Sequence, residues 1–532
     1  MGRNRTAVIT LPAILAAFSF AVPSAGADSF KVNTGADLAP DGCTTQDCSV
    51  REAVIAANKN NGKDTIILRS NRFHGLAIPG IDEDRSKSGD LDIRGKTTIK
   101  ASEKKLATIH ANGIDRVLDI HAPTKINRLE ITGGAINQAN QTGFGILAAD
   151  HRVDINRSLI TENEGAAGNA SSGGLRMGAG GSIVRSKITD NETTSGSGGA
   201  TVVGTADREA LVFRTTISGN TSNSGGGLFT STGTTVVQSK IKNNTAVHCG
   251  GVDLNGGTIL KDSMVAGNET VPSGMLTFGG GGVCLGSDSK IVGSTLEGNT
   301  AAEDGGGVEV FGGKAIINST IAGNTANDEG GGVSVLFSDP FKIERSTFQG
   351  NIAGTDGGGL RAGSARVIVK SSTFQGNEGV LGGGIVANDQ PTGANDSIVD
   401  LRWSTISQNN SGSGGGIGGA DGGSFLSVGT VIDGNTGAPA ATDCDAVVVS
   451  SGHNLIGNPN SCTGLPSESS DVAGNPALLG PLADNGGSTL TMKPKRNSPA
   501  VDAGGNGCPS FDQRGHVRPK GDSCDIGSVE SR

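Results

Sequence analysis

Carboxylates that precede glycine runs are the side chains of this sequence best placed for chemistry. Asp304, Asp328 and Asp356 each lie one or two residues before a Gly-Gly-Gly run, and they follow one another at intervals of 24 and 28 residues. If each interval forms one turn of a stacked structure, the three side chains form an acidic strip that could bind calcium, because Ca²⁺ prefers carboxylate oxygens. Aspartate before a glycine corner is also ordinary turn chemistry, so a solvated strip is the simpler interpretation.

The same part of the chain leaves room for catalysis. A glycoside hydrolase needs an acid and a base carboxylate, and a lyase needs a cation site with a basic side chain. The further charged residues of these segments are Glu303, Glu309, Glu329, Lys342, Glu344, Arg345, Arg361 and Arg366. The sequence contains no Cys-x-x-Cys pair and no Gly-x-Ser-x-Gly elbow, and its seven histidines are scattered. We therefore predict no catalytic residue, and no cofactor other than a calcium ion on the acidic strip.

The first residues predict export. Arg3 and Arg5 precede an apolar stretch from Ala7 to Val22, and the small residues 25–27 offer a cleavage site, so we interpret residues 1–27 as a Sec signal peptide. No other segment reaches 18 consecutive apolar residues, so we expect no transmembrane segment in the mature chain. Removal of the leader takes the net charge from −9 to −11. A chain this acidic is a poor partner for nucleic acid.

Eight cysteines in an exported chain are expected to form disulfides. Short intervening loops favour three pairs, which are Cys43 with Cys48, Cys444 with Cys462, and Cys508 with Cys524. The pairing of Cys249 and Cys284 stays open, because the two fall in neighbouring repeats at different aligned positions. His248 beside Cys249 could suggest a thiol nucleophile, but a buried or bonded cysteine is the simpler interpretation.

The dominant pattern of the chain is an internal repeat. A six-residue phrase, Ser/Thr-x-aliphatic/Phe-x-x-Asn, recurs eleven times from Ser158 to Asn435, at intervals of 24 to 32 residues. Its closing asparagines are Asn163, Asn191, Asn220, Asn244, Asn268, Asn299, Asn324, Asn351, Asn377, Asn409 and Asn435. A short period sustained this long predicts a solenoid, in which each repeat buries its apolar side against its neighbours.

The repeats have the periodicity of β-strands. Apolar and small polar residues alternate over short runs, and the 88 glycines would penalise helices. We predict an all-β, right-handed parallel β-helix of the pectate-lyase-like superfold, with about three strands per coil. The asparagines should accept left-handed backbone at a corner and form a ladder, and the glycine runs should supply positive φ. The apolar residues of the phrases should form one inward column, which is Ile160, Ile188, Ile217, Ile241, Val265, Leu296, Ile321, Phe348, Phe374, Ile406 and Ile432.

The segment before the repeats resembles a known family. Ser49 and Glu52 have the spacing of a capping box and should open a short amphipathic helix. The stretch Cys48-Ser-Val-Arg-Glu-Ala53 resembles the CSLREA domain of exported bacterial proteins. That resemblance continues through residues 64–68, 89–93 and 115–119. A helix here would cover open strand edges, so we interpret Arg51 and Glu52 as structural residues.

The end of the chain resembles the choice-of-anchor Q region. The matching stretches are Gly452-His-Asn-Leu-Ile-Gly457, 478–487, 498–504, Asp512-Gln-Arg-Gly515 and 524–527. In that family the region precedes surface-sorting tails, so the resemblance implies secretion or display at the cell surface or outer membrane. The predicted division is a signal peptide (1–27), a CSLREA-like cap (28–63), a parallel β-helix (64–440) and a choice-of-anchor Q-like region (441–532).

Two functions fit these features. The repeats resemble those of polymorphic outer membrane proteins, more weakly than the two ends resemble their families, and β-helices also include polysaccharide-cleaving enzymes. With no tyrosine and one tryptophan, aromatic-lined sugar sites are disfavoured. We predict a secreted or surface-displayed, non-catalytic monomer that binds a polysaccharide or another cell-surface ligand, as an adhesin does. The alternative is a polysaccharide lyase or glycoside hydrolase, which should show clustered carboxylates with Lys or Arg in a cleft of the middle coils.

Overall fold

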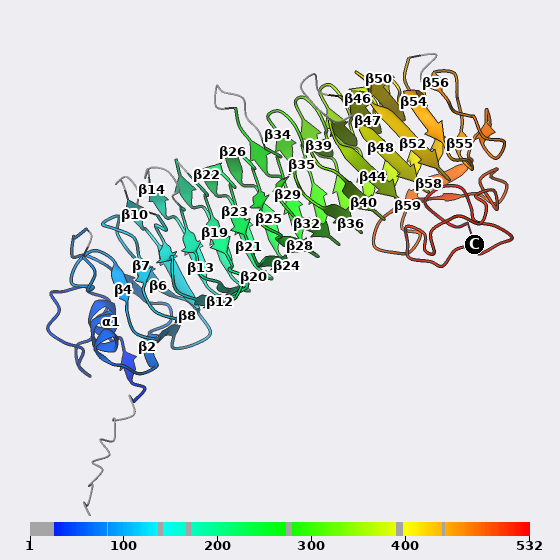
Figure 1. Ribbon diagram of the computed structural model, residues 1–532. Coiled ribbons are helices and arrows are strands. Elements are labelled where there is room, and N and C mark those ends of the chain that lie inside the picture. The colour runs from blue at the N-terminus through cyan, green and yellow to red at the C-terminus, as the bar shows by residue number, and fades with distance from the viewer. Residues whose placement is uncertain are drawn as a thin grey trace, which may run out of the picture.

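The protein is one rod of stacked coils. The computed structural model describes residues 26–81, 83–136, 142–165, 172–194, 196–272, 279–389, 397–438 and 442–531. The first coils lie at one end of the rod and the C-terminal segment lies at the other (Figure 1). The signal peptide predicted for residues 1–27 lies outside the described residues, apart from its last two. Within the described ranges, no helix is long and apolar enough to cross a membrane.

Each central coil contains four strands. One such coil consists of β35 (Val308–Phe311), β36 (Ala315–Ile317), β37 (Thr320–Ala322) and β38 (Thr325–Ala326). These pair in parallel with the strands of the next coil, β39 (Val333–Leu336), β40 (Phe341–Glu344), β41 (Thr347–Gln349) and β42 (Ile352–Ala353). The predicted all-β, right-handed parallel β-helix is confirmed. The expected three strands per coil is wrong, because the chain turns again at the asparagine and adds a short fourth strand.

The strands line up in four columns, which we call stacks 1 to 4 after β35, β36, β37 and β38 in that order. Among the described residues, stacks 3 and 4 are sheets of 16 and 11 strands. Stacks 1 and 2 belong to one sheet with 30 described strands, because β54 (Cys444–Ser450) pairs with β51 (Ile417–Ala420) of stack 1 and with β52 (Ser424–Val428) of stack 2. The parallel ladders continue past residue 440 and reach β57 (Val472–Ala473) in stack 3.

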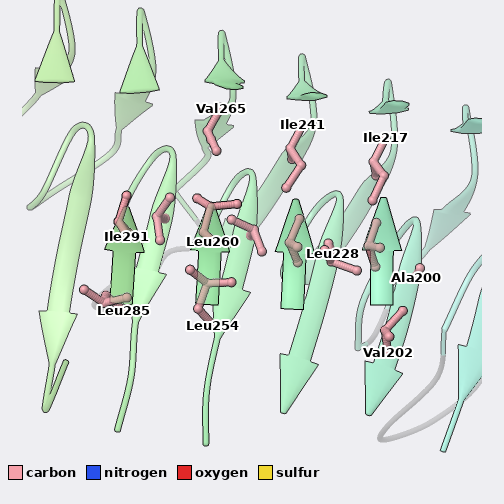
Figure 2. Packing of buried hydrophobic residues seen from close by; sticks show 14 of the residues in the cluster. Ala200, Val202, Ile217, Leu228, Ile241, Leu254, Leu260, Val265, Leu285 and Ile291 are labelled. Carbon is pink, nitrogen blue, oxygen red and sulfur yellow. The ribbon is translucent and has the colours of Figure 1, made fainter. Parts of the chain in front are cut away.

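The apolar residue of each repeat phrase points into the core, as predicted. Ile321 lies over Phe348 in the register of β37 and β41, and Phe348 lies over Phe374 in β45 (Thr373–Gln375). All three side chains are fully buried, and the two phenyl rings stack with centroids 4.3 Å apart. Burial of one such side chain contributes roughly 1.5–3 kcal/mol. Figure 2 shows the same column nearer the N-terminus, in Ile217, Ile241 and Val265.

The asparagines that close the phrases form a continuous buried ladder, as predicted. Asn299 Nδ2 donates to Asn324 Oδ1 at 2.9 Å, and Asn324 Nδ2 donates to Asn351 Oδ1 at 2.9 Å. Because every amide points the same way, the ladder ends on a donor, Asn435 Nδ2. Asp443 Oδ1 accepts that last bond at 2.9 Å. A carboxylate therefore caps the one end of the ladder at which a buried N–H would otherwise lack a partner.

The corners of the coil differ from the prediction. The ladder asparagines do not have positive φ; the residue before each one does, as at Gly323 (φ 59°) before Asn324. A second left-handed residue precedes the Ser or Thr that opens each phrase, as at Asn318 (φ 51°) before Ser319. That serine belongs to a second ladder, in which the backbone N–H of Ser319 donates to Ser346 Oγ at 3.2 Å. The Ser or Thr that opens each phrase and the Asn that closes it therefore both accept backbone N–H groups at the corners of the coil.

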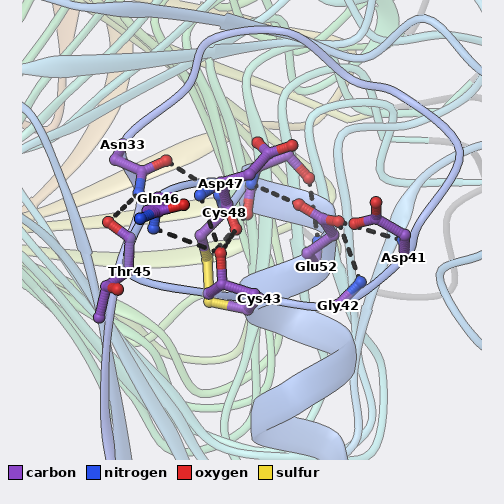
Figure 3. The surroundings of a disulfide bond; sticks show 11 residues. Asn33, Asp41, Gly42, Cys43, Thr45, Gln46, Asp47, Cys48 and Glu52 are labelled. Atoms are coloured by element: carbon purple, nitrogen blue, oxygen red, sulfur yellow. Dashed lines mark hydrogen bonds between the residues drawn. A yellow bond between two sulfur atoms is a disulfide. The ribbon is translucent and has the colours of Figure 1, made fainter.

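Helix α1 (Val50–Lys59) closes the N-terminal end of the rod (Figure 1). The predicted capping box is present, since Ser49 Oγ accepts from the Glu52 N–H at 3.2 Å and Glu52 Oε2 accepts from the Ser49 N–H at 2.7 Å. Glu52 Oε1 also accepts from the backbone N–H groups of Asp41 and Gly42, beside the Cys43–Cys48 disulfide (Figure 3). Glu52 therefore fixes the loop that leads into the helix.

Arg51 is the buried link between the helix and the first coils. Its guanidinium pairs with both carboxylate oxygens of Asp37, at 2.8 and 2.9 Å. It also donates to the backbone carbonyls of Ser86, Gly89 and Asp90 at 2.8 to 3.2 Å. With its donors occupied by the fold, Arg51 has the structural role that the sequence indicates.

After the last coil the chain folds back along the outer side of stack 3. It first forms an antiparallel pair, β58 (Leu479–Ala483) with β59 (Thr491–Pro494). Figure 1 shows this segment beside the last coils, in orange to red.

The motif at residues 512–515 provides the main docking contact of this segment. Gln513 is buried; its Nε2 donates to Thr347 Oγ1 at 2.9 Å, and its Oε1 accepts from Thr373 Oγ1 at 2.6 Å. The backbone N–H of Ser528 donates to Thr405 Oγ1 at 3.1 Å. The threonines of the repeat phrases thus form the surface on which the C-terminal segment packs.

Candidate functional site

The acidic residues singled out by the sequence lie at the turn from stack 4 to stack 1. Each glycine run folds there over the outer side of the strand that follows it. A Cβ added at Gly305 (φ +67°) would lie 2.8 Å from the Cβ of Glu309, and one added at Gly357 (φ +70°) would lie 2.9 Å from that of Arg361. Because of this cover, Glu309 and Arg361 point away from the core and yet are each 1% exposed.

Glu309, Ser334 and Arg361 occupy one outer row of stack 1 on three successive coils. Arg361 Nη2 pairs with Glu329 Oε2 at 2.8 Å, and its guanidinium lies against Gly363, where an added Cβ would meet the guanidinium carbon at 2.4 Å. Arg361 Nε and Nη1, Ser334 Oγ and both carboxylate oxygens of Glu309 are buried and make no hydrogen bond of ordinary geometry with described residues. The row therefore holds buried donors and acceptors whose hydrogen-bonding capacity is only partly used.

The acidic strip has a different composition from the one predicted. Asp304, Glu329 and Asp356, which directly precede their glycine runs, form the row. The Glu329 N–H donates to Asp304 Oδ1 at 3.0 Å, and the N–H of Gly330 donates to the Asp356 carbonyl at 2.9 Å. Asp328 lies one residue outside this row and is exposed. Glu329 lies between Asp304 and Asp356 in this row because the row contains the residue directly before each glycine run, whatever its type.

Burial raises the pKa of four carboxyls around Arg361. The pKa of Glu329 rises to about 7, although the Arg361 cation opposes the rise. Burial raises the pKa of Glu309 well above its usual value, and the nearby Asp304 carboxylate adds to that effect. The pKa values of Asp304 and Asp356 are raised by burial as well. A cluster that exchanges protons near neutral pH could act in acid–base chemistry.

The calcium site predicted at Asp304, Asp328 and Asp356 gains no geometric support. Within the described ranges, one set of three side chains brings potential metal-ligand atoms within 4.8 Å of one another, and it lies in the first coils. Two of the predicted ligands are also engaged, because Asp304 Oδ1 accepts the Glu329 N–H and Asp328 Oδ1 accepts from Thr355 Oγ1 at 2.8 Å. Calcium on this strip stays a prediction.

A groove of about 630 Å³ crosses the outer side of stack 2 in the same coils. Its lining includes Asp288, Lys290, Lys314, Phe337, Lys342 and Glu344. The hollow has a simple cause, since Ala315 lies between Lys290 and Lys342 in one outer row and places a short side chain between two long ones. Phe337 is 67% exposed at this groove. The groove offers cationic, anionic and aromatic groups, and it shares no lining residue with the Arg361 cluster.

The C-terminal segment extends this surface. A hollow of about 200 Å³ shares Glu344 with the groove and is lined by Lys370 and by Phe511 of the C-terminal segment. Phe511 is 49% exposed. Two exposed phenyl rings therefore belong to adjoining hollows on one side of the rod.

All eight cysteines are bonded. The structure holds the three pairs expected from spacing, Cys43–Cys48, Cys444–Cys462 and Cys508–Cys524. It also joins Cys249 to Cys284 on the neighbouring coil, with Cα atoms 5.4 Å apart. Cys249 is therefore part of a disulfide and not a free thiol.

The sequence did not reveal the groove. Of its lining residues, the sequence indicated only Lys342 and Glu344 as candidates, among the charged residues near the acidic strip. Lys290 begins the short alternating segment Lys290-Ile-Val292, which indicates an outward-pointing side chain. That signal does not indicate a groove, because the depth of an outer row depends on the side chains of neighbouring coils.

Comparison with known proteins leaves the activity open. No family model matches the chain and no curated protein matches it, so the likenesses of its two ends to CSLREA and choice-of-anchor Q regions stay resemblances. Among solved structures, the crystal structure of pectate lyase Pel9A is similar over 96% of this chain and 97% of that chain, at 13% identity and a TM-score of 0.24. Similarity at this level supports no argument about activity. The β-helix itself rests on the strand register described above.

Proposed function

We propose that this protein is an exported, non-catalytic rod that binds a polysaccharide of a cell surface in the groove on stack 2. The observation that carries the proposal is the groove of about 630 Å³, in which the exposed ring of Phe337 accompanies lysine and carboxylate side chains. Binding pockets typically combine apolar contact with a few polar groups that fix orientation. The C–H faces of a sugar pack on an aromatic ring, and its hydroxyls hydrogen-bond to charged side chains.

The lysines of the groove can bind an acidic polysaccharide, beside the lining carboxylates of Asp288, Asp339 and Glu344. Lys314 Nζ already pairs with Asp288 Oδ1 at 2.6 Å. No described residue forms an ion pair with Lys290 or Lys342, so these two ammonium groups can meet carboxylates of uronic acid units. Together with the adjoining hollow at Phe511, the surface suits several sugar units of an extended chain.

Four disulfides support the export that the proposal requires, because disulfides persist in oxidising compartments. The predicted leader at residues 1–27 and the resemblances of both ends agree with that location. Display at the cell surface is part of the proposal.

The test is affinity electrophoresis of the mature chain in gels that contain polygalacturonate or alginate. We expect retardation of the wild type, and about tenfold weaker binding for Phe337→Ala and for Lys342→Ala, which corresponds to about 1.4 kcal/mol. Phe73→Ala is the matched control, because Phe73 is 54% exposed but lies in β3 (Phe73–Gly75) of the first coils. Equal weakening in all three variants, or no binding to any acidic polymer, would refute the groove as the binding site.

A polysaccharide-cleaving enzyme is the second candidate, and the Arg361 cluster is the observation that favours it. Glu329, with a pKa raised by burial to about 7 and Arg361 at 2.8 Å, has the properties of a general acid or base. We expect the purified chain to release neither reducing ends nor unsaturated products from the polymers it binds. Release of such products by the wild type, and its loss in Glu329→Gln, would establish the enzyme instead.

A further inference from the structure

Asp84, Asp92 and His121 come together on the outer side of the first coils. Asp92 lies in β4 (Leu91–Ile93) and His121 directly follows β7 (Leu118–Ile120), the strand that pairs with β4. The backbone N–H of His121 donates to the Ile93 carbonyl at 2.9 Å, which fixes its position beside Asp92. Asp84 approaches from the loop that precedes β4, and one potential ligand atom of each of the three side chains lies within 4.8 Å of the others.

The distances in this cluster suit ligands around an ion better than a direct hydrogen bond. His121 Nε2 lies 3.4 Å from Asp92 Oδ1, whereas N–H···O bonds cluster near about 2.9–3.0 Å. Ligand atoms about 2.1 Å from a tetrahedral Zn²⁺ are themselves separated by about 3.4 Å. Asp119 Oδ1 also lies 3.4 Å from His121 Nε2, so two carboxylates approach this nitrogen.

An unpartnered polar atom supplies a second reason to expect a ligand. His121 Nε2 is shielded from solvent and has no hydrogen-bond partner among the described residues. The Asp92 side chain is 2% exposed; its Oδ2 accepts from the Ser86 N–H at 2.7 Å, and its Oδ1 lies 3.4 Å from His121 Nε2. A buried polar atom without a hydrogen bond is unfavourable, and a metal ion between His121 Nε2 and Asp92 Oδ1 would bind both atoms.

The surrounding charges also favour a cation. Asp84, Asp90, Asp92 and Asp119 gather here, and two guanidinium groups pair with three of them. Arg116 contacts Asp90 at 2.8 Å and Asp119 at 3.3 Å, and Arg94 contacts Asp84 at 3.4 Å. Asp92 has no such partner among the described arginines and lysines. A divalent ion beside it would balance the remaining negative charge.

We propose that Asp84, Asp92 and His121 form a binding site for a divalent metal ion of the zinc class. One imidazole nitrogen with two carboxylates suits Zn²⁺ or Mn²⁺ better than Ca²⁺, which binds through oxygen alone. Ser86 orients the buried carboxylate, as outer groups commonly do for metal ligands. The ion ties the loop before β4 to the next coil, next to the carbonyls that Arg51 already holds. The site is separate from the proposed sugar groove, so either proposal can fail without the other.

The experiment is isothermal titration of chelator-treated mature chain with Zn²⁺, with Co²⁺ as a spectroscopic probe. We expect one equivalent to bind and a visible absorption typical of tetrahedral Co²⁺. His121→Ala and Asp84→Asn should each weaken Zn²⁺ binding more than tenfold and remove the Co²⁺ band. Asp84 is 74% exposed, so its substitution should leave the fold intact. His151→Ala, at a corner of a later coil, is the matched control and should bind as the wild type does.

Asp84→Asn also separates the metal site from a simpler arrangement, a protonated His121 between Asp92 and Asp119. Asp84 is a member of the proposed ligand set but is not an ion-pair partner of His121. If Zn²⁺ does not bind the wild type, or binds Asp84→Asn and His121→Ala as tightly as the wild type, the proposal is wrong and the histidine is an ion-pair residue.

Discussion

One buried guanidinium sets the electrostatics of the acidic cluster in the middle coils. Arg361 contacts Glu329 directly and favours the charged forms of Asp304, Glu309 and Asp356. Burial acts in the opposite direction on all four carboxyls and is the larger effect. The glycine runs cause that burial, because they hold the turn over the outer row of stack 1. Protonation of these side chains should therefore affect stability.

Stability should fall as pH rises through the range in which Glu329 loses its proton. Its pKa is about 7 in the folded chain against an ordinary value of 4.5, so the folded state binds more protons than the unfolded state between these values. We expect the wild-type melting temperature to decrease between about pH 5 and pH 8, with a smaller decrease in Glu329→Gln, which mimics the protonated acid. Differential scanning calorimetry across this range is the measurement.

Glu297→Gln is the control for that series, because Glu297 is exposed on stack 3. Its pH profile should match the wild type. If Glu329→Gln and Glu297→Gln give the same profile, the Arg361 cluster is not the source of the pH dependence.

Gly357 should be among the least replaceable glycines. It has φ +70°, and an added Cβ would lie 2.6 Å from the Leu360 carbonyl oxygen and 2.9 Å from the Arg361 Cβ. We expect Gly357→Ala to lower the free energy of unfolding by about 3 kcal/mol or more, because backbone strain and steric overlap add. Gly298 has φ +59° but open space around it, so Gly298→Ala should show the backbone effect alone, about 1–2 kcal/mol. Equal losses in the two variants in denaturant titrations would argue against the packed turn.

Within a coil, the sequence predicts those structural features that need the same residue type at the same position of every repeat phrase. The inward apolar column and the asparagine ladder are of this kind, and both are confirmed. The left-handed corner before each Ser or Thr could not be predicted in this way. The residues that occupy it are of different types, as Arg345, Ser371, Trp403 and Gly429 show. Because these corner positions share only a backbone conformation, no residue type recurs at them in the sequence.

The asparagine ladder should be more important for stability than its surface counterparts. Asn324 Oδ1 accepts both the backbone N–H and the side-chain N–H of Asn299. Asn324→Ala leaves these two buried donors unpaired, at about 1–3 kcal/mol each. We expect a loss of several kcal/mol in chemical denaturation, and faster amide exchange in the flanking coils.

Asn327→Ala is the control for the ladder, since Asn327 is exposed three residues further along the same coil. It should change stability by less than about 0.5 kcal/mol. A comparable effect of the two substitutions would show that the ladder does not stabilise the rod.

In the whole molecule, the acidic row, the groove and the proposed metal site each bring together residues from different coils, which no local sequence pattern connects. Glu329 replaces Asp328 in the acidic row through a shift of one residue against the next coil. The sugar groove depends on the short side chain of Ala315 lying between two lysines from other coils. Asp84 and His121 meet only because β4 and β7 stack. Such juxtapositions follow from register and turn length, which a single sequence does not specify.

The C-terminal segment should detach from stack 3 when its docking residue is removed. Gln513 makes hydrogen bonds with Thr347, Thr373 and Thr489 and is buried among them. We expect Gln513→Ala to speed cleavage after residue 473 in limited proteolysis while the coils stay intact. Gln408→Ala, at an exposed glutamine on the rod, should leave the cleavage rate unchanged. Equal rates for the two variants would show that Gln513 is not the docking contact.

The most direct test of ligand binding by the rod is a crystal structure of the mature chain soaked with an acidic oligosaccharide that it binds in solution. We predict an intact sugar chain in the groove on stack 2, packed on Phe337 and within hydrogen-bond distance of Lys342. A sugar bound instead at Glu329 and Arg361, and cleaved there, would contradict the proposal of a non-catalytic binding rod.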